Sequence, residues 1–202
     1  MSLTYRFEHE RQAAAETVKS VLDQLGLPEP REEGIDRRNR YYIEYVARPF
    51  IDLPPGSITV YVEVLSGNRD NPIFYYITFK YFNWQILAQP NARNYDIEIT
   101  DYTTDLNQLA DKVRFLYDRL RQYADAIHEF ETTLALLFLE PVKIKLLIND
   151  EPSDQLASFL DYAIYDANDN RIAFDIISGT DPLSTLQSLT ADPNQILDRI
   201  KS

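Results

Sequence analysis

The sequence predicts an α+β fold in which antiparallel β-sheet is combined with an N-terminal helix, one long central helix and two short C-terminal helices. Three observations predict this. Apolar residues recur at three- and four-residue spacings near the N-terminus and again across the middle of the chain, as in amphipathic helices. Apolar and polar residues alternate in several shorter segments, as in half-buried strands. Stretches rich in Pro, Gly, Asn and Asp separate these segments and are typical of turns.

Residues 5–25 are predicted to form the first helix, because one apolar stripe runs along them. Gly26 follows the stripe, where a helix often ends on a residue with positive φ, and Pro28 prevents continuation. We expect the polar segment 26–39 to be a surface connection. The stripe consists of Ala14, Val18, Val21, Leu22 and Leu25.

Strand-like segments fill the rest of the first half. Residues 57–65 alternate most clearly, with Ile58, Val60, Val62 and Val64 on one face. The other segments are β-branched, aromatic or alternating, and turn residues separate them. The predicted strands are residues 40–47, 57–65, 73–82 and 95–100, with a further short run at 84–88.

The central helix is predicted over residues 104–139, with Thr104 or Asp105 as its cap and Pro141 beyond its end. This length exceeds the usual 8–20 residues. Two interpretations are open: the helix breaks near Thr132 and Thr133, so that the chain covers itself, or it stays whole and packs on a second chain. The apolar residues that need a cover are Phe130, Leu134, Leu137 and Phe138.

Three strands and two short helices are expected in the last third. Asp181-Pro182 and Asp192-Pro193 each resemble a helix cap followed by a proline in the first turn. The strands are predicted at 142–149, 159–166 and 171–178, and the helices at 182–190 and 193–201. We expect either two parts, 1–103 and 104–202, or one continuous domain.

The hairpins around residues 62–77 and 162–176 resemble each other. Asp70-Asn71-x-Ile73 matches Asp169-Asn170-x-Ile172, and Ile77 and Ile176 follow four residues later. One interpretation is that Asp-Asn turns recur by chance between strands. The other is a duplicated α-β-β-β unit.

Composition excludes several classes of function. The formal net charge of −12 disfavours broad binding to nucleic acid or anionic membranes, since phosphate contacts require a basic surface. The absence of Cys excludes disulfides, thiol catalysis and thiolate metal sites. No window of 18 apolar residues predicts a membrane span, and the first residues lack the apolar core of a secretory signal. We therefore expect a cytoplasmic location, or a particle assembled in the cytoplasm.

No catalytic, cofactor-binding or metal site is predicted. His9 lies in a polar helix start, and His128, with Asp125 and Glu131 on the same helix side, has no second set of ligands. The segment 166–177 departs from a calcium loop at its required Gly and Glu positions. The five Gly residues form no nucleotide-binding loop.

Residues 73–84 contain seven aromatic residues in twelve positions. Phe74, Tyr76 and Phe82 fall on one face of the predicted strand, where only Thr78 and Lys80 interrupt them. The strand is therefore either central and covered on both faces, or it presents aromatic side chains to a partner. The candidate interface residues are Tyr75, Phe79, Tyr81 and Trp84 from the strand, and Phe130, Leu134, Leu137 and Phe138 from the helix.

These features predict a non-catalytic protein-interaction or assembly module that works with protein partners as a homo-oligomer or as a subunit of a larger complex. Examples are an adaptor, a chaperone, or a structural subunit of a phage or injection-type particle. Two alternatives remain open at this point: a metal-dependent or hydrolytic enzyme, and an acidic inhibitor that mimics nucleic acid.

Overall fold

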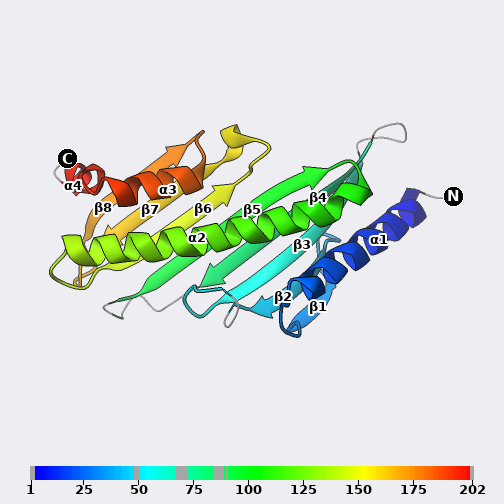
Figure 1. Ribbon diagram of the computed structural model, residues 1–202, viewed down its shortest axis with the longest axis horizontal. Coiled ribbons are helices and arrows are strands. Elements are labelled where there is room, and N and C mark those ends of the chain that lie inside the picture. The colour runs from blue at the N-terminus through cyan, green and yellow to red at the C-terminus, as the bar shows by residue number, and fades with distance from the viewer. Residues whose placement is uncertain (1–2, 48–50, 67–71, 84–88, 90, 201–202) are drawn as a thin grey trace.

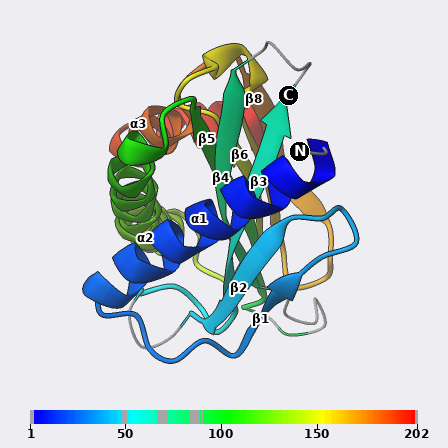
Figure 2. The same cartoon turned by 90° about the vertical axis from the view of Figure 1, so that its right-hand side faces the viewer.

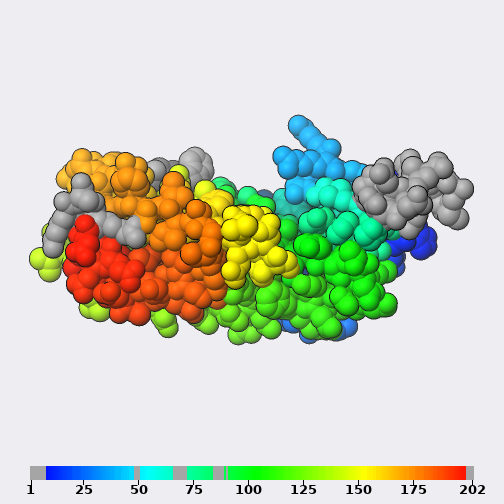
Figure 3. All heavy atoms as spheres, turned by 90° about the horizontal axis from the view of Figure 1, so that it is seen from above, coloured from blue at the N-terminus to red at the C-terminus, as the bar shows by residue number. Residues whose placement is uncertain are grey.

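The computed structural model describes residues 3–47, 51–66, 72–83, 89 and 91–200. One eight-stranded sheet runs in the order β1 to β8, so that each strand lies beside the one that precedes it in the chain (Figure 1). Neighbouring strands are antiparallel throughout, except that β5 and β6 are parallel. The α+β prediction is therefore confirmed, and the molecule is elongated along the sheet (Figures 1 and 3).

The strands are β1 (Glu32–Ile35), β2 (Tyr41–Val46), β3 (Ser57–Ser66), β4 (Ile73–Asn83), β5 (Arg93–Thr103), β6 (Lys143–Asp150), β7 (Phe159–Tyr165) and β8 (Arg171–Ser178). The α-helices are α1 (Leu3–Gln24), α2 (Leu109–Leu137), α3 (Pro182–Ala191) and α4 (Asn194–Ile200). Two short 3₁₀ turns, η1 (Leu106–Gln108) and η2 (Gln155–Ala157), precede α2 and β7.

Helix α2 is the crossover between the two parallel strands. It leaves the end of β5, packs along β4 and β5 and returns the chain to the start of β6. Parallel neighbours require such a long connection, because both strands must begin at the same end of the sheet. Figure 2 shows α2 and α3 along one side of the strands, with α1 crossing over the end of the sheet that contains β2 and β3.

The core lies between this helical layer and the sheet. Burial alternates along β4, so that Tyr75, Ile77, Phe79 and Tyr81 face the helices and are buried. The stripes of α1 and α2 supply the other half, including Val18, Leu22, Leu116 and Leu120. Burial of these apolar surfaces is the main force that holds the layers together.

The structure corrects two expectations about secondary structure and decides whether the long helix is broken. The segment 26–39 is not only a connection, because it contains β1, whose residues Glu32–Ile35 pair with β2. Helix α2 does not break at Thr132, whose hydroxyl donates to the carbonyl oxygen of His128 within the continuous helix. Asp105 caps the turn η1, so the long helix itself begins later, at Leu109. The short run at 84–88 lies outside the described residues.

The two halves share the order of a helix followed by an antiparallel meander, but the matched hairpins are not equivalent. Ile77 faces the helices and is fully buried, whereas Ile176 lies on the opposite face and is 64% exposed. A register shift between Ile164 and Tyr165 moves β8 out of phase with β4. Asp70 and Asn71 lie outside the described residues. Within the described residues the two hairpins therefore differ in register, and one sheet continues from β5 to β6 across the boundary at residue 103.

Candidate protein-interaction surface

The sheet face opposite the helices carries no helix in the described part of the chain, and we call it the uncovered face. Polar and apolar side chains are mixed on it, since each strand places alternate residues there. Large apolar side chains nevertheless stay partly exposed. Leu65, Phe82, Tyr102, Phe174 and Ile176 are 41–64% exposed.

Three aromatic rings form a cluster on this face, and we call Phe74, Tyr76 and Tyr102 the aromatic cluster. The ring centroids of Tyr76 and Tyr102 are 5.3 Å apart, and those of Phe74 and Tyr102 are 5.8 Å apart. The register explains the contact, because Tyr76 on β4 lies directly opposite Tyr102 on β5. Leu65 on β3 pairs with Phe74 and extends the apolar surface.

A second apolar group lies toward the other end of the face. Phe82 of β4 borders a hollow of about 300 Å³ together with Asp96, Lys145 and Leu147. Further along, Phe174 and Ile176 project from β8. The uncovered face therefore has two apolar regions rather than one continuous patch.

Charged residues separate these two regions. Lys80 lies 3.2 Å from Asp96 and 3.3 Å from Glu98, so one ammonium group serves two carboxylates. Burial lowers the pKa of Lys80, but the two carboxylates outweigh it and the pKa is raised. Glu63 makes no ion pair within the described residues. The region between the two apolar groups therefore carries charged side chains of both signs.

The structure places most of the candidate interface residues in the core. Tyr75, Phe79 and Tyr81 face the helices and are at most 5% exposed. Phe130 and Leu134 are also buried, and the ring of Phe130 packs edge-on against Tyr162 of β7. The remaining helix residues, Leu137 and Phe138, pack partly buried against the same core, and Trp84 lies outside the described residues.

The apolar stripe of the long helix is therefore buried by other parts of the same chain. Helix α2 lies between α1 and α3 and contacts both. Of the two interpretations, the chain covers itself, but it does so with a continuous helix and not with a broken one.

The exposed face of β4 is the one that carries Phe74, Tyr76 and Phe82. Sequence reasoning noted this face but did not choose it. Two polar residues on this face, Thr78 and Lys80, could have identified it as the exposed one. Burying the ammonium group of Lys80 without a partner would cost free energy, so its face is expected to stay in contact with water. On the helical side, no polar residue interrupts Tyr75, Ile77, Phe79 and Tyr81.

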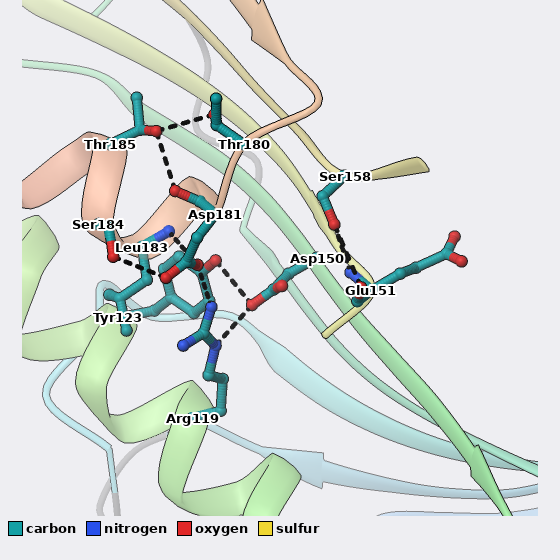
Figure 4. Close-up of polar contacts among 10 residues, drawn as sticks. All are labelled: Arg119, Tyr123, Asp150, Glu151, Ser158, Thr180, Asp181, Leu183, Ser184 and Thr185. Carbon is teal, nitrogen blue, oxygen red and sulfur yellow. Dashed lines mark hydrogen bonds and ion pairs between the residues drawn. The ribbon is translucent and has the colours of Figure 1, made fainter. Parts of the chain in front are cut away.

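A buried group of charged side chains on the helical side joins α2, β6 and the start of α3. Arg119 of α2 donates to Asp150 of β6 at 2.7 Å and to Asp181 before α3 (Figure 4). The hydroxyl of Tyr123 donates to the same Asp150 at 2.8 Å. Asp181 is the N-cap of α3, and its carboxylate also accepts hydrogen bonds from the Leu183 backbone N–H and from the Ser184 hydroxyl.

The pKa shifts in this group fit a structural role. Burial raises the pKa of Tyr123, and the charge of Asp150 adds to the effect. Burial also raises the pKa of Asp181, but its hydrogen bond from Ser184 and the charge of Arg119 outweigh this, so the pKa falls below 3.8. Arg119 keeps its charge, because Asp150 outweighs the cost of burial. Tyr123 therefore stays neutral, and Arg119 and Asp181 stay charged near neutral pH, as in a structural ion-pair network.

The two histidines stay separate. His9 and His128 are both exposed, and Glu131, one of the carboxylates near His128, is engaged with Arg93 at 3.0 Å and with the hydroxyl of Tyr95. Within the described ranges, no three His, Asp or Glu side chains gather closely enough to hold a metal ion.

None of the described helices has the length and apolar character needed to cross a membrane. Comparisons with protein-family models, with curated proteins and with solved structures found no match, so they assign this chain neither a family nor a function.

Proposed function

We propose that the protein is a non-catalytic interaction or assembly module that binds a protein partner on the uncovered face of its sheet. One observation carries this proposal. The described helices pack against one face of the sheet, while the other face has Leu65, Phe82, Tyr102, Phe174 and Ile176 as partly exposed apolar side chains. Exposed apolar groups of this kind, rimmed by polar residues, mark interaction sites.

The composition of the face supports a protein as the partner. Tyr and Phe offer large apolar area, and the Tyr hydroxyl can still form a hydrogen bond at a partly wet interface. The net charge of −12 disfavours nucleic acid and anionic lipid. A cytoplasmic location, or a place in a particle assembled there, belongs to the same proposal.

Quantitative capture from an extract of the source organism tests the proposal. Three baits are compared: the wild type, a face variant with Tyr76→Ser and Tyr102→Ser, and a control variant with Phe115→Ser and Leu136→Ser. The control residues are exposed apolar side chains of α2, 45% and 84% exposed, and lie on the helical side.

We expect at least one protein that binds the wild type and the control bait equally and binds the face variant at least about tenfold less, because loss of two central aromatic contacts costs more than 1.4 kcal/mol. That protein must then form a stoichiometric complex when both components are purified. If every captured protein binds the three baits equally, the uncovered face is not the binding surface.

A further inference from the structure

We infer that the aromatic cluster binds an arginine side chain of the partner, with Glu63 as its counter-charge. This inference rests on the proposed function and adds the chemistry of the partner. The cluster consists of Phe74, Tyr76 and Tyr102, and Glu63 of β3 lies directly opposite Tyr76 in the register of the sheet.

The chain already covers other exposed rings of this face with its own arginines. The guanidinium carbon of Arg40 lies 4.2 Å from the ring centre of Tyr61 on β3. That of Arg171 lies 3.7 Å from the ring centre of Phe174 on β8. A guanidinium group is stabilised on a ring face by electrostatic attraction and stacking. It is also more weakly hydrated than an ammonium group, so its desolvation costs less free energy.

Within the described residues, the aromatic cluster has no arginine over its rings. Among the described residues, no Arg or Lys side chain lies over the rings of Phe74, Tyr76 or Tyr102. The hydroxyls of Tyr76 and Tyr102 also make no hydrogen bond within this part of the chain. Among the residues that the structure describes, the three rings therefore have no cation over them, and the two hydroxyls have no hydrogen-bond partner.

The negative charge around the aromatic cluster favours a positively charged ligand there. Glu63 carries no ion pair within the described residues, and it lies beside the middle of the cluster. The surrounding protein is acidic, with a net charge of −12, which attracts a basic segment before contact. A stacked nucleobase would bring a phosphate toward the same carboxylate, which is unfavourable.

Arginine fits this combination better than lysine. Its planar group can stack on Tyr76 or Tyr102 while its N–H groups bond the carboxylate of Glu63. Leu65, which is 46% exposed beside Phe74, provides apolar surface for a neighbouring residue of the partner. The expected partner segment therefore contains an arginine next to an aliphatic or aromatic residue.

Selection from a random dodecapeptide library tests the inference on the intact chain. Peptides are selected on the wild-type protein and then measured against Tyr102→Ser, Glu63→Gln and the control Phe115→Ser. Each peptide that depends on Tyr102 is resynthesised with its arginine replaced by citrulline, which keeps the shape of the side chain and removes the charge. A single-stranded oligothymidine is measured in parallel.

We expect the Tyr102-dependent peptides to be enriched in arginine. Replacement by citrulline should weaken binding at least about fivefold, and Glu63→Gln at least about threefold, within the range of a cation–π contact and a charge-assisted hydrogen bond. Phe115→Ser should leave binding unchanged.

Tyr102-dependent peptides without arginine, or with unchanged affinity after citrulline replacement, overturn the arginine inference and leave the proposed function intact. Tighter Tyr102-dependent binding of oligothymidine also overturns it. If no peptide is enriched, or if no enriched peptide depends on Tyr102, the arginine inference fails, and the capture experiment with the face variant decides separately whether the uncovered face binds a partner.

Discussion

Arg119 and Asp150 form an ion pair between α2 and β6, with 2.7 Å between Nε and Oδ2 and with Asp150 only 1% exposed. The same guanidinium bonds Asp181, so one side chain joins the long helix, the parallel strand and the start of α3. The position of α3 over β6 and β7 thus depends on polar contacts as well as on its apolar residues Leu183, Leu186 and Leu189.

Replacing Arg119 with Ala is expected to lower the free energy of unfolding by about 3–5 kcal/mol, because Asp150 then becomes an unpaired buried charge. The exposed Arg114→Ala, which breaks a surface pair with Asp111, should cost about 1 kcal/mol or less. Urea denaturation followed by circular dichroism measures both. Equal losses in the two variants would show that the buried pair does not anchor the helices.

The two faces of β4 are expected to respond differently to truncation. Phe79 is fully buried against the helices and contacts Tyr117, so Phe79→Ala should cost about 3–5 kcal/mol. Phe82 lies on the uncovered face and is 45% exposed, so Phe82→Ala should lower the free energy of unfolding by about 1 kcal/mol or less. Thermal and urea unfolding of the two variants test the assignment. A larger loss for Phe82→Ala would mean that the faces are reversed.

Local patterns predicted most of the fold. The alternation in 57–65 and the aromatic and β-branched residues of 73–82 predicted the paired strands β3 and β4. Asp181-Pro182 marked the start of α3, whose cap has the predicted geometry. Both signals depend on residues close together in sequence. The strand β1 was missed because Glu32–Ile35 is four residues long, and its exposed charged residues show no apolar alternation.

Long-range pairing could not be predicted in this way. The parallel contact between β5 and β6 joins residues about 50 positions apart, such as Tyr95 and Leu146, and nothing in either segment specifies the other. The same contact decides where α2 lies, and therefore why Phe130 and Leu134 are buried in their own chain. The candidate residues Tyr75, Phe79 and Tyr81 lie on the buried side of β4 for a related reason, since period-2 alternation separates the faces of a strand but does not say which one the helices cover.

Gly56 is expected to resist substitution, whereas Gly34 is not. A Cβ atom at Gly56 would lie 2.5 Å from the backbone oxygen of Phe82 on β4, which requires a shift of the backbone. A Cβ at Gly34 meets the ring of Tyr42 at 3.4 Å, an ordinary contact. Gly56→Ala should therefore destabilise by about 1–3 kcal/mol, and Gly34→Ala should be within about 1 kcal/mol of the wild type. The melting temperature of Gly56→Ala should be lower than that of Gly34→Ala. Equal melting temperatures would contradict the close contact between position 56 and the backbone of Phe82.

Acid is expected to weaken the attachment of α3. The pKa of Asp181 is raised by burial, but the hydrogen bond from Ser184 and the charge of Arg119 outweigh this effect and lower it below its usual 3.8. A carboxyl group with a lowered pKa in the folded state adds stability above its unfolded pKa, and this contribution is lost as the pH falls through the folded pKa. The stability difference between the wild type and Asp181→Asn should therefore be largest near pH 6 and should shrink below about pH 4.

Asparagine is also a good N-cap, so the variant removes the charge and keeps the helix start. The matched control is Asp192→Asn before α4, where Asp192 accepts from the Asn194 backbone and makes no ion pair in the described part of the chain. Its difference from the wild type should vary less with pH. Urea denaturation at half-unit steps from pH 6 to pH 2 provides the comparison. An Asp181→Asn difference that stays constant over this range would show that the ion pair with Arg119 adds no pH-dependent stability.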